Sequence, residues 1–262
     1  MPKITIHSIL LSIHNISVCK HLYRWTSSSK NAIMNFGKQQ TVAGVITIVS
    51  GVLAVACVIT GMIALDYDFD AFADPMLMLT MHNINVSAAR WSMVFDMFGY
   101  YLFLLPLIFL LHRWMKDKSL WAHLVSFCGS SYVLAGAMGA SILAAVWPSI
   151  LSHYSRAEGE IQIVMKANFQ FVNGIVYDGL WNLLEMFFAG MWWLMTGAIL
   201  YRQKFSFIGI FTAALGVCSL LDDLATIFQF SPLHQLTSNA YLFLAIIWAI
   251  LFGAFLLKQP LK

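Results

Sequence analysis

Long apolar stretches separated by short polar segments make up most of the sequence. A helix needs about 20 apolar residues to cross the ~30 Å hydrocarbon layer of a membrane. Six stretches of 20 residues or more meet this requirement. They are Val42–Leu65, Trp91–Leu111, Leu120–Trp147, Gln170–Leu200, Phe207–Phe228 and Ser238–Leu257. The pattern predicts an all-α polytopic membrane protein with six transmembrane helices, whose bundle covers residues 41–258.

The composition supports this class. Of the 262 residues, 60% are hydrophobic and 10% are charged, whereas roughly a quarter of residues are charged in soluble domains. The four cysteines fall in four separate segments without paired spacing, so neither a disulfide framework nor a thiolate metal site is expected. We expect no metal, no cofactor and no nucleic-acid partner from the sequence. The lipid bilayer is the partner that it implies, and it names no protein partner.

The distribution of Lys and Arg predicts the orientation, because cytoplasmic loops are enriched in these residues. With a cytoplasmic N-terminus, twelve Lys and Arg fall in inner segments and three in outer segments. The inner ones are Lys3, Lys20, Arg24, Lys30, Lys38, Arg113, Lys116, Lys118, Arg202, Lys204, Lys258 and Lys262, and the outer ones are Arg90, Arg156 and Lys166. Both termini are therefore predicted to be cytoplasmic, as tails of residues 1–40 and 259–262. Met34 lies just before the first stretch and is an alternative start of translation.

The fourth stretch, Gln170–Leu200, carries a polar stripe. On a 3.6-residue period one helical face holds Gly174, Asp178, Trp181, Asn182, Glu185, Ala189, Trp192 and Thr196. An ionised carboxylate at the bilayer centre costs at least ~2.5–3.5 kcal/mol. We therefore expect this face to turn towards other helices or a wet cavity.

The third stretch carries small residues at four-residue intervals, at Gly136, Ala140 and Ala144. Small side chains let helix backbones approach closely. We therefore expect this helix to lie centrally in the bundle.

Other apolar stretches also contain carboxylates, at Asp96, Asp222 and Asp223. The helical rise places these three with Asp178 at a similar depth in the outer half of the membrane, with Glu185 about 10 Å deeper. No Lys or Arg lies deep within any predicted span. Carboxylates without cationic partners cannot all stay ionised in a low dielectric, so either several are protonated or they hold a cation.

These features favour a carboxylate-lined cavity, open to the outer face, that binds or moves a proton, a cation or a small cationic solute. The candidate site residues are Glu185, Asp178, Asp223, Asp96 and Asn182. One alternative is a non-catalytic scaffold or accessory subunit, in which the polar stripe only fastens helices together. A second is a metal-dependent intramembrane hydrolase with His153 and His234 as rim ligands. Common hydrolase and phosphate-loop motifs do not occur in the sequence, which favours a non-enzymatic role.

Four short segments carry a family resemblance. They are the Gly-rich first stretch after Gln39-Gln40, the segment Arg90–Asp96, the run Gly197–Arg202 followed by Phe207–Ile210, and Leu220–Leu224. Together they resemble an uncharacterised family of bacterial multi-spanning membrane proteins, domain of unknown function 4386, over roughly residues 40–258. The resemblance implies a six-helix bundle in a bacterial inner (cytoplasmic) membrane. It implies no mechanism, because the family has no assigned activity.

Overall fold

The computed structural model describes residues 36–68, 71, 75–81 and 83–261. Regular secondary structure in these ranges is helical, and six helices are long and apolar enough to cross a membrane. They are Phe36–Ala64, Val86–Met115, Ala122–Tyr154, Gly159–Arg202, Ser206–Ile227 and Ser231–Lys258. The prediction of an all-helical protein with six candidate spans is confirmed. Residues 1–35 of the predicted N-terminal tail lie outside the described residues.

Two of the six helices are composite. The second consists of α3 (Val86–Asp96), a π-helical turn η2 (Met97–Tyr101), a 3-10 turn η3 (Leu102–Leu104) and α4 (Leu105–Met115). The fourth consists of α6 (Gly159–Asn173), a π-helical segment η4 (Gly174–Glu185) and α7 (Met186–Arg202). The others are α5 (Ala122–Tyr154), α8 (Ser206–Ile227) and α9 (Ser231–Lys258). A short 3-10 helix, η1 (Pro75–Leu79), lies between the first two spans.

Pro106 accounts for the irregular centre of the second helix. Proline lacks an N–H group, and its ring clashes with the carbonyl group four residues earlier, here that of Leu102. The helix changes at Leu102 from the π-helical turn to the 3-10 turn, and Pro106 then occupies the first turn of α4. The break places the side chains of Tyr100 and Tyr101 inside the bundle, where both are buried.

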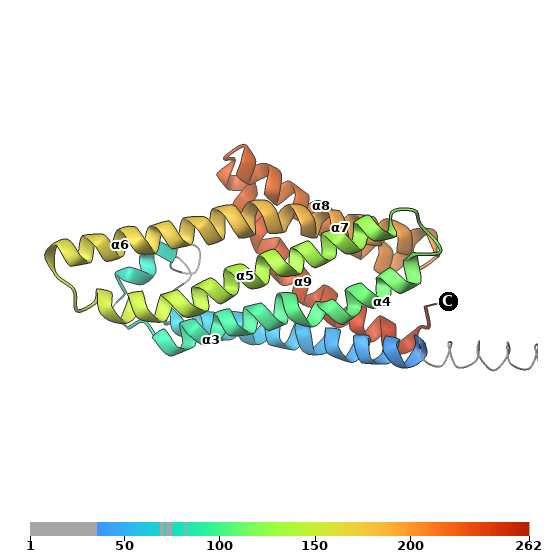
Figure 1. Cartoon of the computed structure of the whole chain (residues 1–262), viewed down its shortest axis with the longest axis horizontal. Coiled ribbons are helices and arrows are strands. Elements are labelled where there is room, and N and C mark those ends of the chain that lie inside the picture. The colour runs from blue at the N-terminus through green and yellow to red at the C-terminus, as the bar shows by residue number, and fades with distance from the viewer. Residues whose placement is uncertain (1–35, 69–70, 72–74, 82, 262) are drawn as a thin grey trace, which may run out of the picture.

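The bundle is elongated, and most helices run along its long axis (Figure 1). Both ends of the described chain lie at the same end of the bundle, here called the terminal end (Figure 1). The turn between α5 and α6 forms the opposite end, here called the hairpin end. The turn between α8 and α9 lies part-way along the bundle and projects to one side (Figure 1).

The helices differ greatly in length. The 22 residues of α8 correspond to about 33 Å, which matches the hydrocarbon layer. The 44-residue helix Gly159–Arg202 corresponds to about 66 Å, and α5 continues through Pro148 to Tyr154. The two helices therefore continue past the span boundaries predicted at Trp147 and Gln170, to Tyr154 in α5 and back to Gly159 in α6.

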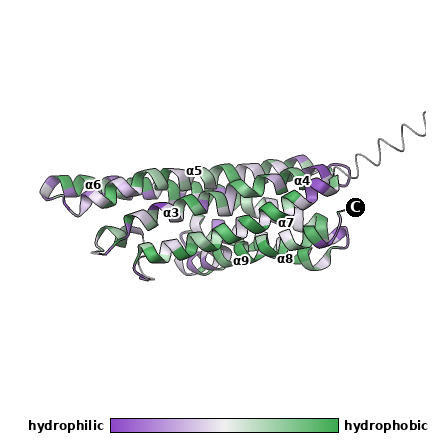
Figure 2. Ribbon diagram, turned by 90° about the horizontal axis from the view of Figure 1, so that it is seen from below, coloured by the Kyte–Doolittle hydropathy of each residue, from purple (hydrophilic) through white to green (hydrophobic). Residues whose placement is uncertain are grey.

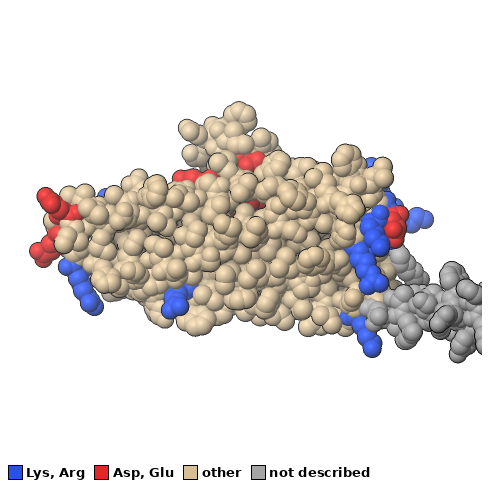
Figure 3. Space-filling model, in the orientation of Figure 1, with Lys and Arg blue, Asp and Glu red and all other residues tan. Residues whose placement is uncertain are grey.

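The outer surface is that of a membrane protein. Large apolar side chains are exposed along the bundle, among them Val52, Phe127, Leu134 and Ile210. Hydrophobic residues make up much of every long helix (Figure 2). Lys and Arg gather at the terminal end (Figure 3). Exposing so much apolar surface to water is unfavourable, so the bundle must contact lipid.

Glycines allow α7 and α8 to pack closely against each other. An added Cβ at Gly197 would collide with the backbone of Ala213, and one at Gly216 with the backbone of Leu194. Such small residues allow membrane helices to pack backbone against backbone. The close packing of α7 against α8 also fixes the position of η4 relative to α8, because η4 continues directly into α7.

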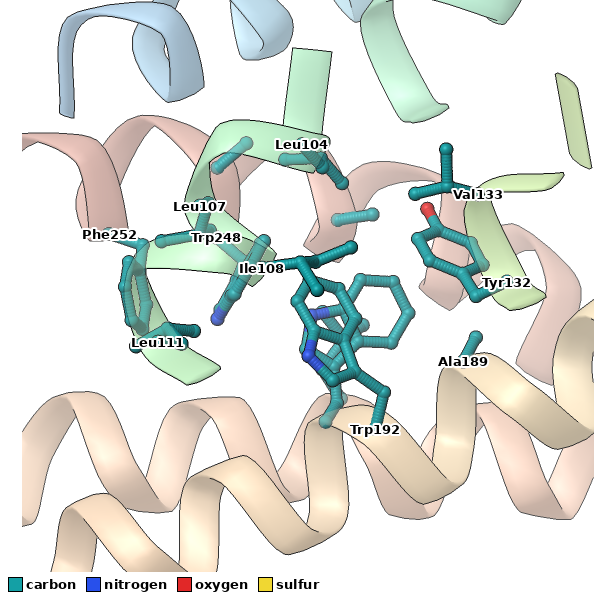
Figure 4. Close-up of a cluster of buried hydrophobic side chains, with 14 of the residues drawn as sticks. Leu104, Leu107, Ile108, Leu111, Tyr132, Val133, Ala189, Trp192, Trp248 and Phe252 are labelled. Carbon is teal, nitrogen blue, oxygen red and sulfur yellow. The ribbon is translucent and has the colours of Figure 1, made fainter. Parts of the chain in front are cut away.

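Buried aromatic rings, here called the aromatic core, pack together on the terminal side of Glu185. Figure 4 shows Tyr132, Trp192, Trp248 and Phe252 among the aliphatic side chains of this cluster. The ring centroid of Trp192 lies 5.7 Å from that of Tyr132 and 5.7 Å from that of Trp248. Trp192, Trp193 and Trp248 are all at most 1% exposed. This core closes the interior between Glu185 and the terminal end.

Candidate functional site

A cavity of about 460 Å³ lies between the hairpin end and the aromatic core. Its walls come from the first helix, η1, α3, η2, η4 and the first half of α9, with Trp147 of α5. Both π-helical segments contribute to it, which fits the frequent use of such segments at functional sites. Pockets that hold small molecules typically have volumes of about 300–1,000 Å³.

Glu185 lies at the inner end of this cavity and is 1% exposed. The Tyr101 hydroxyl donates a hydrogen bond to Oε2 at 3.0 Å, and the Tyr241 hydroxyl donates to Oε1 at 3.1 Å. The Tyr132 hydroxyl lies 3.5 Å from that of Tyr241 and donates to the carbonyl of Tyr100 at 2.7 Å. Side chains from η2 and α9 therefore hold the carboxyl group of Glu185, each of its oxygens has a donor, and Tyr132 of α5 lies beside one of the two donors.

Asp96 is the second carboxyl group of the cavity and is far less well satisfied. It is the last residue of α3 and is 8% exposed. Its Oδ1 lies 4.0 Å from Sγ of Cys57, which is a weak donor. Its Oδ2 is buried without a hydrogen-bond partner among the described residues. A buried polar atom without a partner costs about 1–3 kcal/mol, so a hydrogen-bond donor that reached this oxygen would be stabilised.

Asp178 does not join Glu185 in the cavity, although the polar stripe was expected to bring them together. Asp178 is exposed and is not part of the lining. The reason is η4: its i→i+5 hydrogen bonds advance each residue by less than the ~100° of an α-helix. Over the seven residues from Asp178 to Glu185 this difference turns the two side chains to different faces. The cavity face of η4 consists instead of Tyr177, Trp181, Asn182 and Glu185.

Asp222 and Asp223 of α8 are buried but do not line the cavity. Oδ1 of Asp222 accepts a hydrogen bond from Thr237 Oγ1 at 2.5 Å and lies 3.2 Å from Nδ1 of His234. His234 does line the cavity, so it connects Asp222 to the cavity rim. Asp223 is 7% exposed. Of the five site residues predicted from sequence, the structure brings together Asp96, Asn182 and Glu185, and it leaves Asp178 and Asp223 outside the cavity.

The small residues of α5 support the site in an unexpected way. As expected, α5 is central and packs against α3, η2, α4, η4, α6 and α7. The space beside its glycines, however, holds aromatic rings instead of a helix backbone. An added Cβ at Gly136 would overlap the ring of Tyr101, and one at Gly139 would overlap the ring of Trp181. Trp181 also donates its Nε1–H to the carbonyl of Gly136 at 3.2 Å.

The sequence did not point to the tyrosines or to the polar start of α9. Tyr101, Tyr132 and Tyr241 lie on three different helices, and a lone tyrosine in an apolar stretch is more typical of an interfacial anchor. The polar face at the start of α9, in contrast, could have been recognised from the spacing of its polar residues. Its cavity face includes Ser231, Gln235, Ser238 and Asn239. This three- to four-residue spacing is that of a helix with one polar face.

Two carboxyl groups and His234 are among the ionisable side chains that line the cavity. Asp96 and Glu185 line it, and no Lys or Arg of the described chain does. Within the described ranges, no three His, Cys, Asp or Glu residues are grouped so that they could hold a metal ion.

The comparisons with known proteins agree with this architecture. A family model described as a domain of unknown function, DUF4386, matches residues 49–259. No curated protein matches the chain, and no solved structure does. The resemblance seen in the short sequence segments is confirmed over most of the chain. The protein therefore belongs to the family called domain of unknown function 4386.

Proposed function

We propose that this membrane protein binds a proton, a cation or a small cationic solute in its cavity, and that it moves or senses this solute. One observation carries the proposal: two buried carboxyl groups, Asp96 and Glu185, line one cavity that no Lys or Arg of the described chain lines. A buried charge without a counter-charge is strongly disfavoured, so such groups take up a proton or a cation.

The two carboxyl groups have different roles in this proposal. Glu185 is held by Tyr101 and Tyr241 and supplies fixed negative charge at the inner end. Asp96, with its unpartnered oxygen, contacts the solute directly. Asn182 adds a neutral polar group on the same wall.

We further propose that the terminal end faces the cytoplasm. Of the ten described Lys and Arg residues, seven lie at or near this end: Lys38, Arg113, Lys116, Lys118, Arg202, Lys204 and Lys258. Positive residues are enriched in cytoplasmic segments. The cavity then opens towards the outer side and the aromatic core closes it towards the cytoplasm. In a bacterium the membrane would be the inner membrane.

The scaffold alternative has an observation of its own. The α6 helix leaves Ile161, Ile163 and Val164 exposed on the hairpin that extends past the other helices. A partner protein could dock there. This role does not require the cavity to bind anything, so a binding measurement separates the two proposals.

Tryptophan fluorescence of the purified protein in detergent provides this measurement, because Trp147 and Trp181 line the cavity. The emission would be followed over pH and over a panel of monovalent and divalent cations. We expect a titration that is lost in Asp96→Asn and Glu185→Gln. Asp178→Asn is the matched control, since this exposed carboxylate lies outside the cavity, and it should behave as wild type. A flat response of the wild-type protein to pH and to all cations would leave only the scaffold role.

A further inference from the structure

The size and lining of the cavity indicate which kind of cation it takes. We infer that the solute is a protonated organic amine, an ammonium ion that keeps at least one N–H group and carries an apolar or aromatic body. This inference rests on the proposed cation-binding function and specifies its substrate class.

The volume of the cavity is the first argument. A cavity of about 460 Å³ is far larger than one water molecule, which occupies about 30 Å³ in the liquid. A bare inorganic ion would therefore be accompanied by many waters in a cavity whose walls are largely apolar, including Leu65, Met78 and Met93. An organic body fills this space and covers these side chains.

The oxygen ligands are the second argument. A cation such as Ca²⁺ takes roughly six to eight oxygen ligands around one point. Both carboxyl oxygens of Glu185 already accept hydrogen bonds from tyrosines, and the described residues contain no cluster of metal-binding side chains. Of the two carboxyl groups that line the cavity, only that of Asp96 has an oxygen without a hydrogen-bond partner among the described residues. One carboxylate suits an ammonium group better than a metal ion.

The aromatic lining is the third argument. Cations bind to the faces of Trp and Tyr rings, and this attraction is stronger in a desolvated site. Six aromatic side chains line the cavity: Tyr100, Tyr101, Trp147, Tyr177, Trp181 and Tyr241. Tyr177 and Trp181 pack edge to face, with ring centroids 4.8 Å apart, on the same wall as Glu185. This wall provides both electron-rich rings and negative charge.

The unpartnered oxygen of Asp96 distinguishes between kinds of ammonium ion. A buried carboxylate oxygen requires a hydrogen-bond donor, and a protonated amine has an N–H group to give. A quaternary ammonium ion has none and would leave Oδ2 of Asp96 unsatisfied. Hydrogen bonds between charged groups are about twice as strong as neutral ones. The cavity should therefore prefer the protonated amine.

Isothermal titration calorimetry of the wild-type protein with three matched probes tests the inference. Phenethylammonium has charge and N–H groups, trimethyl(phenethyl)ammonium has charge alone, and phenethyl alcohol has neither. We expect phenethylammonium to bind and the alcohol not to bind. The quaternary ion should bind about 10-fold more weakly than phenethylammonium, because it cannot donate a hydrogen bond to Asp96. Comparable binding of all three probes, or of the quaternary ion and phenethylammonium, would overturn the inference.

Two variants test whether the probe binds at Asp96. Asp96→Asn should weaken phenethylammonium binding by about 10- to 100-fold, the range expected for a lost charged hydrogen bond. Asp178→Asn, outside the cavity, should leave it unchanged. Unchanged binding to a monodisperse Asp96→Asn protein would contradict the assignment, and the three probes on the wild type decide the substrate class even if this variant does not fold.

These measurements also distinguish a failure of the amine assignment from a failure of the proposed cation-binding function. A response to protons or Na⁺ without any to phenethylammonium overturns the amine class and leaves cation binding intact. No response to any cation overturns both.

Discussion

Gly136 of α5 provides the space in which the ring of Tyr101 lies, and substituting it tests the construction of the site. A Cβ at this position would overlap three atoms of the Tyr101 ring. Tyr101 is 5% exposed, so the ring has little room to move away. In Gly136→Ala the ring must shift, and its hydrogen bond to Oε2 of Glu185 must lengthen or break.

The expected cost combines three contributions. Overpacking a core costs about 1–3 kcal/mol, and loss of a hydrogen bond to a charged group costs about 1.5–3 kcal/mol. The greater helix propensity of Ala returns about 0.5–1 kcal/mol. The balance is a loss of about 2–5 kcal/mol in the free energy of unfolding.

Unfolding by SDS in mixed micelles, followed by tryptophan fluorescence, would measure this loss. Gly179→Ala is the control, because a Cβ there meets no atom within 4 Å. The control should be as stable as wild type or slightly more stable. Gly136→Ala should also bind the cationic probe more weakly, since it displaces a wall of the cavity. If Gly136→Ala matched Gly179→Ala in stability and kept wild-type binding, the placement of Tyr101 against Glu185 would be refuted.

Three further substitutions have definite expectations. Gly197→Leu should prevent α7 and α8 from packing at close range, so the purified protein should lose at least about 3 kcal/mol of stability or fail to remain monodisperse on gel filtration. Tyr241→Phe removes one of the two donors to Glu185 and should cost about 1.5–3 kcal/mol in the same unfolding assay; no change would mean that this hydrogen bond is not made. His234→Ala takes one polar partner from buried Asp222 and should cost about 1–3 kcal/mol, with unaltered unfolding as the contrary result.

The membrane fold was predictable because it depends on length and apolarity. A bilayer requires about 20 apolar residues per helix whatever their order, and the six stretches from Val42 to Leu257 each meet this requirement. The ends were less predictable. Pro148 and the mixed segment after it resemble a loop in hydropathy, yet α5 continues to Tyr154 and α6 starts at Gly159.

The site was predictable only in part. The presence of Glu185 and Asp96 inside apolar stretches was enough to identify them as internal carboxyl groups. Which residues share the cavity depends on the helical period, and the sequence gives no sign that residues 174–185 form a π-helix. The assumed 3.6-residue period therefore placed Asp178 beside Glu185, whereas the wider turn exposes Asp178 and turns Tyr177 into the cavity.

Infrared difference spectroscopy of the reconstituted protein would show whether Asp96 contacts a bound amine, because it observes the carboxyl groups themselves. Spectra would be recorded with and without phenethylammonium for the wild type, Asp96→Asn and Asp178→Asn. We expect a change in the carboxyl bands on binding that disappears in Asp96→Asn and persists in Asp178→Asn. Carboxyl bands that do not respond in the wild type, or that respond equally in Asp96→Asn, would contradict this expectation.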